Sequence, residues 1–304
     1  ATLAKLVVAA RKQPTIVLTT VNAILQRVPP RGFIRKTIKQ IAPGQRIDMK
    51  RLIERLQLIG YQRTGTVMEP GEYAVRGGIL DLFSPGRSSP VRLDFFGDTL
   101  ESIKTFDVET QRTMKLVQKL VLLPVSEVAF GEEATAMFRR RYVELFGGAK
   151  SDDHLYESVS AGRRYAGQEH WLPLFHDKLE TLLDYLPGAS LSFDHMSDEA
   201  IRQRFDLIGE HYEARRDARE TETFGAPPYK PVPPEQMYLD GAAWAKALHA
   251  HPLYRLTPFE EPAGANVRSW NGRSGRSFAP ERQAGDVNVF DAVVAHIRKL
   301  QAGK

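Results

Sequence analysis

The sequence predicts an α/β protein that carries a smaller domain with a largely antiparallel sheet. Near its start, a helix-like pattern leads into a short β-branched run, and this alternation is typical of doubly wound sheets. Residues 61–112 then hold several short β-type runs between turn signals. They lie too close together for parallel crossovers, which need about a dozen connecting residues. With 304 residues, 42% hydrophobic and 26% charged, the chain is long enough for two or three ordinary globular domains.

The first forty residues predict the beginning of the larger domain. Residues 1–12 place apolar side chains on one helix face, and Pro14 ends that helix. Residues 15–21 (TIVLTTV) form a β-branched run that is typical of a buried strand. Because the chain begins at Ala1, inside a helix-like run, we interpret it as a piece of a longer protein.

Residues 41–124 are predicted to form the smaller domain and to fold on their own. Asp48 is a favourable N-cap residue, an amphipathic helix follows it, and Gly60 suits the position just after the helix end. Gly97-Asp98 predicts a tight two-residue hairpin between two of the β-type runs. Lys119–Pro124 predicts a strand that returns the chain to the larger domain.

The run Val91–Phe96 alternates between an apolar and a charged face. Its odd-numbered residues are apolar and point to one side, which predicts a core face. Its even-numbered residues, Arg92, Asp94 and Phe96, point to the other side, where charged residues are ordinarily just solvated. An aromatic between charges, with Arg76 ending a neighbouring run, favours a docking surface, because aromatic residues and Arg anchor interfaces. We predict that this face is exposed and that the two Arg side chains flank the Phe96 ring.

Beyond residue 124 the chain is predicted to be mainly helical. Helices are expected over 134–146, 153–162, 198–220, 244–248 and 287–300, and short strands over 190–196 and 253–259. The Pro-rich segment 221–234 is predicted to be extended, either as a linker or as a strap packed over the domain.

The motifs of nucleotide hydrolysis are incomplete. A phosphate loop needs the pattern GxxxxGK[ST], and the nearest string, Phe146–Ser151 (FGGAKS), lacks Gly before Lys and lies between predicted helices. At the end of the strand predicted over 190–196, His195 follows Asp194 where a second carboxylate would help to hold Mg²⁺. We therefore expect no catalytic residue in this chain.

Composition excludes some classes of site and leaves others open. Cys is absent, which excludes disulfides, thiolate zinc sites and Cys nucleophiles, and the eight scattered His residues predict no metal site. The net charge of +5 permits a nucleic-acid partner, and Arg139–Arg141 and Arg163-Arg164 are the clusters able to contact phosphates. With no signal peptide and no run of 18 apolar residues, we expect a cytoplasmic protein without a membrane partner.

Three stretches of the smaller domain carry a family resemblance. GEYAVRGGILDLF (71–83), PVRLDFFGDTLESI (90–103) and FDVETQRT (106–113) resemble the bacterial transcription-repair coupling factors, the Mfd family. The excision-repair protein UvrB shares a looser version of the pattern. In that family the segment is the small domain that binds UvrA, and Arg76, Arg92 and Phe96 fall on motif positions used for this binding.

The resemblance implies an organisation for the whole chain. It implies a degenerate helicase-like domain of the P-loop NTPase type with a parallel sheet, incomplete at its N-terminus and interrupted by the small domain. We accordingly divide the chain into 1–40 (second part of the first helicase-like subdomain), 41–124 (UvrA-binding domain), 125–265 (return segment) and 266–304 (linker and first helix of the next domain).

The resemblance also implies a function in transcription-coupled repair. The chain is expected to recruit UvrA to damage at stalled RNA polymerase, without enzymatic activity or cofactor of its own. The parent protein would be an ATP-dependent DNA translocase that uses ATP and Mg²⁺ in its motor domains. It would contact RNA polymerase and double-stranded DNA, and its C-terminal domain would contact this module.

Two alternatives compete with this interpretation. The first is a fragment of UvrB itself, a damage-binding helicase subunit, but residues 15–45 leave no room for the long aromatic-rich hairpin that UvrB inserts into DNA. The second is a nucleotide hydrolase whose phosphate loop lies outside this chain, and the unpaired Asp194 argues against it.

Overall fold

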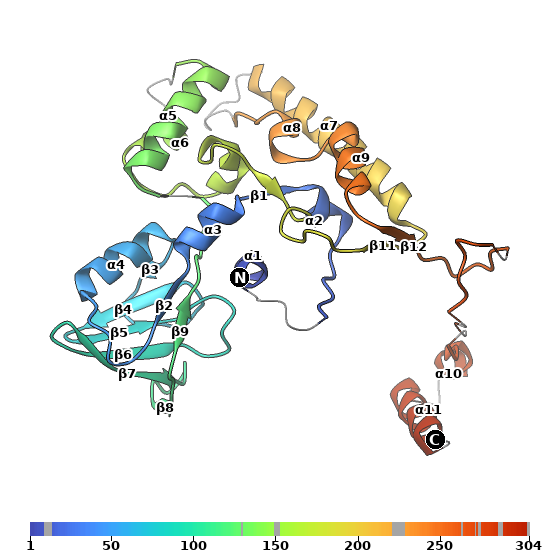
Figure 1. Cartoon of the computed structure of the whole chain (residues 1–304), viewed down its shortest axis with the longest axis horizontal. Helices are drawn as coiled ribbons and strands as arrows, with labels where there is room; N and C mark the ends of the chain where they lie inside the picture. Colours follow the sequence, from blue (N-terminus) through green and yellow to red (C-terminus); the bar gives the residue numbers. More distant parts are fainter. Residues whose placement is uncertain are drawn as a thin grey trace. The chain divides into compact units, whose positions relative to one another are not determined.

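Figure 1 shows the computed structural model of the chain. It describes residues 1–8, 14–128, 130–148, 153–220, 229–262, 264–270, 272, 275–284 and 288–302. The chain divides into two compact units, Ala1–Arg255 and Leu256–Lys304.

The first unit contains a six-stranded sheet with the strand order β3-β4-β5-β6-β7-β8. Its strands are β3 (Gln62–Arg63), β4 (Glu72–Arg76), β5 (Ile79–Leu82), β6 (Val91–Phe96), β7 (Thr99–Phe106) and β8 (Thr113–Leu116). All neighbours pair antiparallel except β3 and β4. The predicted hairpin at Gly97-Asp98 is confirmed: it joins β6 to β7 where Phe96 pairs with Thr99, and Gly97 has a φ of 57°.

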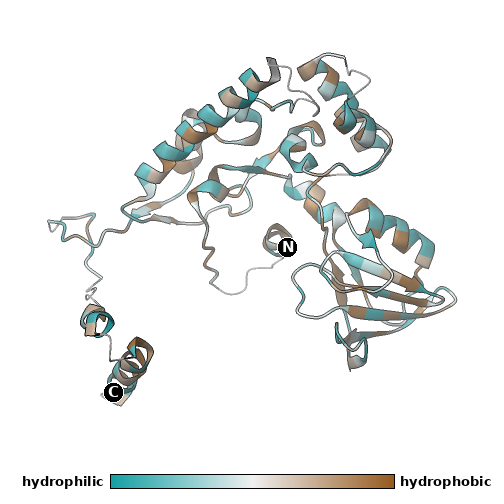
Figure 2. Cartoon of the chain, turned by 180° about the vertical axis from the view of Figure 1, so that it is seen from behind, coloured by the Kyte–Doolittle hydropathy of each residue, from teal (hydrophilic) through white to brown (hydrophobic). Residues whose placement is uncertain are grey.

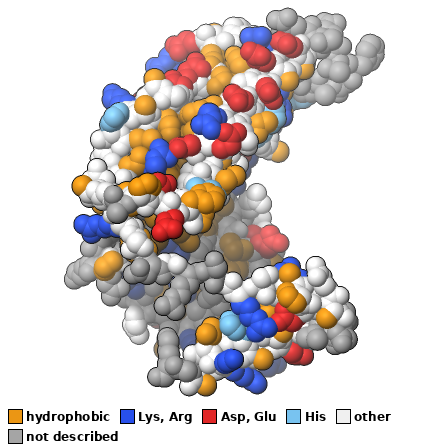
Figure 3. Space-filling view, turned by 90° about the vertical axis from the view of Figure 1, so that its right-hand side faces the viewer, with side chains coloured by type: hydrophobic (Ala, Val, Ile, Leu, Met, Phe, Trp, Pro, Cys, Tyr) orange, Lys and Arg blue, Asp and Glu red, His pale blue; other side chains and the backbone are white. Residues whose placement is uncertain are grey.

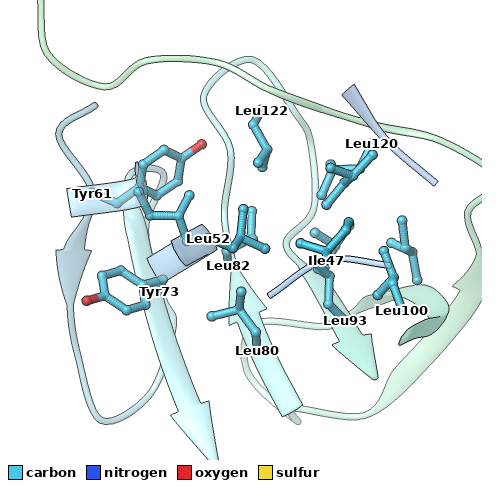
Figure 4. Close-up of a cluster of buried hydrophobic side chains, with 14 of the residues drawn as sticks. Ile47, Leu52, Tyr61, Tyr73, Leu80, Leu82, Leu93, Leu100, Leu120 and Leu122 are labelled. Atoms are coloured by element: carbon cyan, nitrogen blue, oxygen red, sulfur yellow. The ribbon is translucent and has the colours of Figure 1, made fainter. Parts of the chain in front are cut away.

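One face of this sheet packs against helix α4 (Met49–Leu58) and the two-stranded sheet of β2 (Lys39–Ile41) and β9 (Leu120–Leu122). Figure 4 shows leucines from the helix and from both sheets meeting in this core. Asp48 caps α4 as predicted, because its carboxylate accepts hydrogen bonds from the amides of Lys50 and Arg51. Gly60 follows the helix with a φ of 107°, and a Cβ there would lie 2.7 Å from the Ser126 amide nitrogen.

The rest of the first unit is mainly helical. Its helices are α1 (Thr2–Val8), α2 (Val21–Leu25), α3 (Arg31–Thr37), α5 (Glu132–Phe146), α6 (His154–Ser160), η1 (Gln168–Leu174), α7 (Ser197–Glu220), α8 (Pro234–Met237) and α9 (Gly241–His249). Short strands pair β1 (Arg27–Val28) with β10 (Glu180–Thr181) antiparallel, and β11 (Leu191–Phe193) with β12 (Leu253–Arg255) in parallel. Figure 2 shows hydrophobic residues along the six-stranded sheet, whereas α7 is mostly hydrophilic.

The prediction of a strand over residues 15–21 is wrong. Residues 14–20 adopt no regular structure, with Ile16 87% and Leu18 92% exposed, and α2 begins at Val21. A β-branched run forms a strand only where another strand offers a hydrogen-bonding edge, and none of the described strands pairs with it. The doubly wound parallel sheet is therefore not observed in the described residues, whose sheets are mostly antiparallel.

The Pro-rich segment is described from Tyr229 onward, and residues 221–228 lie outside the described part. The Trp171 indole nitrogen donates a hydrogen bond to the Lys230 carbonyl at 2.7 Å, and the Lys230 ammonium pairs with Asp153 at 2.6 Å. The Tyr229 ring packs on Trp171 with centroids 4.9 Å apart. From Tyr229 onward, the alternative of a packed strap is thus the one observed.

The second unit contains α10 (Ala279–Ala284) and α11 (Val289–Ala302). The two helices contact each other, and the Phe278 ring meets His296 edge-on at a centroid distance of 5.7 Å. The last helix was predicted over 287–300, whereas the short α10 falls in a stretch for which no helix was predicted. Across the described residues of both units, no helix combines the length and apolar character needed to cross a membrane.

Candidate interaction face of the six-stranded sheet

The candidate site lies on the side of the sheet that faces away from α4. Residues that pair across antiparallel strands point to the same side. The register places Arg76, Ile79, Asp94 and Ser102 in one row and Ala74, Asp81, Arg92, Lys104 and Leu116 in the next. We call this side, together with Phe96, Thr99 and Phe106, the outer face.

One half of the outer face, the covered half, lies beneath a second small core. Val67, Ala74, Phe83 and Phe106 are buried together there, and Val108 packs against them. The loop that follows β7 is fixed by Gln111, whose side-chain nitrogen donates hydrogen bonds to the Val108 and Val67 carbonyls at 2.6 and 3.3 Å.

Arg92 belongs to this covered half. Its guanidinium donates two hydrogen bonds to the Asp81 carboxylate at 2.8 and 2.9 Å, and the Arg92 and Asp81 side chains are only 17% and 3% exposed. A third nitrogen donates to the Gln111 carbonyl at 3.3 Å, and the guanidinium lies 4.9 Å from the Phe106 ring centroid. Hydrogen bonding to Asp81 raises the pKa of Arg92. The guanidinium therefore holds β5, β6 and the loop after β7 together.

The predicted exposure of Arg92 is wrong, and so is its predicted place beside Phe96. The bidentate fork that would receive a partner's carboxylate is already occupied by Asp81. Arg92 lies four residues from Phe96 along β6, which is about 13 Å at the rise of an extended strand. Arg92 therefore does not flank the ring.

The other half of the outer face is open. Phe96 is 76% exposed beside the β6–β7 turn. The exposed Arg76 donates hydrogen bonds to the Gly65 carbonyl at 2.8 Å and the Thr66 hydroxyl at 3.2 Å, and no carboxylate of the described residues pairs with it. Leu116, 68% exposed, lies on the edge strand β8. We call Arg76, Ile79, Asp94, Phe96 and Leu116 the open half.

The charge of Asp94 is neutralised within the open half. Its carboxylate accepts hydrogen bonds from the Ser102 hydroxyl at 2.8 Å and the Lys104 ammonium at 3.0 Å. Partial burial opposes ionisation, but these hydrogen bonds outweigh it and lower the pKa of Asp94. Arg76 is thus the charged residue of the open half that no described carboxylate pairs, and it shares this face with the exposed Phe96 and Leu116.

Sequence reasoning missed Asp81 and Leu116. Asp81 stands in an otherwise apolar strand, and a lone acidic residue there signals a cross-strand partner of opposite charge. Leu116 gave no such signal, because β8 is a short edge strand whose pairing to β7 shifts register.

The other residues singled out in the sequence have structural roles. Asp194 caps α7: it accepts hydrogen bonds from the Ser197 hydroxyl at 2.8 Å and the Met196 amide at 3.0 Å, and the Ser197 bond lowers its pKa. Residues 149–151 of the phosphate-loop-like string lie outside the described residues. Within the described part, no group of three His, Asp or Glu side chains is placed to hold a metal ion.

The sequence of the chain matches known proteins along most of its length. Residues 40–128 match the family model of the UvrB interaction domain. The chain is 34% identical over 259 residues to the transcription-repair-coupling factor of Haemophilus influenzae, covering 84% of this chain and 22% of that protein. It is 36% identical over 229 residues to the Escherichia coli protein of the same name, covering 75% and 19% respectively. The chain thus spans about a fifth of the relatives it matches.

Proposed function

We propose that this chain, which belongs to the transcription-repair-coupling factor family, binds UvrA through the open half of the outer face. The observation that carries the proposal is that the exposed Phe96 ring and the exposed Arg76, which no described carboxylate pairs, lie on the same face of the domain that matches the UvrB interaction family. A large aromatic and an arginine are the residue types that dominate binding energy at interfaces. The relatives compared above are coupling factors, so they do not favour the alternative of a UvrB fragment.

The three predicted site residues take different parts in this proposal. Phe96 supplies the apolar area that a partner desolvates, and Arg76 supplies a positive charge for a carboxylate on UvrA. Arg92 is a positioning residue: through Asp81 it holds β6, which carries Phe96, to β5, the strand that pairs with the β4 strand of Arg76.

The role of the parent protein is part of the same proposal. The parent is an ATP-dependent DNA translocase that engages RNA polymerase and double-stranded DNA in the cytoplasm and presents this module to UvrA. Its motor domains use ATP and Mg²⁺, whereas this chain has no cofactor and no catalysis of its own. The parent's C-terminal domain contacts this module.

The larger part of the chain is proposed to be a degenerate helicase-like domain that has lost hydrolysis. Two observations support this reading: β11 and β12 pair in parallel, and Asp194, at the end of β11, caps a helix with no second carboxylate beside it in the sequence. Residues 41–124 are then the inserted UvrA-binding domain between segments 1–40 and 125–265, and residues 266–304 lead into the next domain.

Titration calorimetry of the chain with purified UvrA tests the proposed site. We expect Phe96→Ala to cost about 2 kcal/mol or more, which is roughly a 30-fold rise in Kd. Arg76→Glu should cost at least as much, because it places like charges opposite each other. Met196→Ala removes an exposed apolar side chain outside the six-stranded sheet and should leave Kd unchanged. Unchanged binding by a folded Arg76→Glu/Phe96→Ala variant would rule out this face.

A further inference from the structure

The charge of the chain is distributed unevenly along its length. Residues 1–40 contain eight Lys and Arg residues and no Asp or Glu. On the face shown in Figure 3, by contrast, basic and acidic side chains are interspersed. A stretch without acidic residues can neutralise its cations only through contacts with distant parts of the chain.

Two of these cations do find such contacts. Arg31 forms an ion pair with Glu180 at 2.9 Å, and the Arg27 side chain donates a hydrogen bond to the Glu235 carbonyl at 3.1 Å. Arg35 and Lys36, in the last turn of α3, are exposed, and Lys39 on β2 is half-buried. No described carboxylate forms an ion pair with any of these last three.

Helix α4 brings further positive charge to the same place. The Arg55 guanidinium donates hydrogen bonds to the Lys36 and Thr37 carbonyls at 2.7 and 3.2 Å, so it lies at the C-terminal end of α3. Arg51 lies one turn earlier on α4, where its guanidinium is 3.8 Å from the carboxylate of the exposed Asp48. We call Arg35, Lys36, Lys39, Arg51 and Arg55 the basic corner.

The arginine cluster Arg139–Arg141, which stands out in the sequence, makes contacts within the protein instead. Arg139 donates to the Ser160 carbonyl, Arg140 lies 3.9 Å from Glu144, and Arg141 donates to the Pro173 and His176 carbonyls. Arg139 and Arg141 thus fix α5 against its neighbours, whereas Arg140 pairs within α5. Arg51 and Arg55 of the basic corner also have internal partners, so the case for an external anion rests on Arg35, Lys36 and Lys39, which no described carboxylate pairs.

We propose that the basic corner binds the phosphate backbone of duplex DNA, independently of UvrA binding. Protein interfaces need an apolar centre, yet the only exposed large hydrophobic side chain of α3, β2 and α4 is Leu58, at the end of α4, which is 48% exposed. Single-stranded nucleic acid is held largely by aromatic stacking, and the absence of exposed aromatic side chains from these elements disfavours it. Cations without apolar or aromatic anchors suit sequence-independent contact with the phosphates of a duplex.

Fluorescence anisotropy with the full chain and a labelled duplex of about 30 base pairs tests the proposal through its salt dependence. The test variant is Arg35→Gln/Lys36→Gln/Lys39→Gln, in which Gln keeps a favourable helix propensity. Each lost phosphate contact lowers the slope of log K against log salt by about 0.9. Between ~50 and ~200 mM salt, the unmodified chain should therefore lose up to about 40-fold more affinity than the variant.

The matched control removes the same charge elsewhere. Arg63→Gln/Lys115→Gln/Lys246→Gln changes three exposed cations outside the corner and should keep the original salt slope. The double variant Arg35→Gln/Lys36→Gln, confined to exposed positions, gives a second measurement if the triple variant melts early, with a slope change of about 1.8. Equal slopes for control and corner variants would overturn the proposal. The proposal would also be overturned if single-stranded DNA bound more tightly than the duplex. Displacement of the duplex by polyglutamate, added at the same concentration of negative charge, would overturn it as well.

Discussion

Arg92 and Arg76 lie on the same face of one sheet, yet their surroundings differ. Arg92 lies in the covered half, where Asp81 and the Gln111 carbonyl use its donors. Arg76 lies in the open half, where it meets only a backbone carbonyl and a hydroxyl in the described residues. The side of a sheet on which a residue points does not decide its function. What decides it is whether another segment covers that position, and here the loop after β7 covers Arg92 and leaves Phe96 free.

The largest loss of folding stability is expected from a change at Leu93, which lies on the core side of β6, the strand that carries Arg92 and Phe96. Leu93 is fully buried against the α4 core, so Leu93→Asp places a carboxylate where it has neither water nor a partner. We expect destabilisation of more than about 4 kcal/mol, seen as loss of amide protection across the six-stranded sheet in hydrogen exchange. Phe96→Asp, three residues along β6, is the matched control and should cost less than ~1 kcal/mol. Similar protection in both variants would contradict the assignment of the two sides.

Breaking the Asp81–Arg92 pair should have the next largest effect. Asp81→Ala leaves the Arg92 charge without its carboxylate in a mostly buried position, which typically costs about 3–5 kcal/mol of folding stability. Replacing both partners with apolar residues of similar size, Asp81→Leu/Arg92→Met, should restore most of that loss. Urea unfolding followed by circular dichroism measures both variants.

The double variant also separates two roles for Arg92. If Arg92 acts through positioning alone, the refolded Asp81→Leu/Arg92→Met chain keeps its affinity for UvrA, because Arg76 and Phe96 remain in place. A folded double variant that has lost UvrA binding would instead show direct contact between Arg92 and the partner.

Alternation and turn chemistry were enough to predict much of the small domain. The two-residue hairpin at Gly97-Asp98, the capped helix after Asp48 and the two sides of Val91–Phe96 all depend on neighbours within a few residues, and all were confirmed. The exposure of Phe96 followed from the same local reasoning.

Features that depend on distant segments could not be predicted in this way. The burial of Arg92 depends on Asp81 eleven residues away and on the loop after β7. Residues 15–21 have the composition of a buried strand, but a strand also needs a partner edge, and composition does not supply one. The basic corner was missed because Arg55 joins Arg35 and Lys36 only through the packing of α4 beside α3.

The smallest expected effect concerns Asp94, in the open half. Hydrogen bonds from Ser102 and Lys104 lower the pKa of Asp94 in the folded chain despite its partial burial. A carboxyl group with a lowered folded-state pKa stabilises the fold above its unfolded pKa of about 3.9, and this contribution disappears as the pH falls through the folded value. Because Asp94 and Lys104 are both partly exposed, Asp94→Asn should cost no more than about 1 kcal/mol at neutral pH. Urea unfolding of both chains should show this difference near pH 7 and its decline as the pH is lowered below ~4. A difference that grew on acidification would mean that the Asp94 carboxylate destabilises the fold, which would contradict its stabilisation by Ser102 and Lys104.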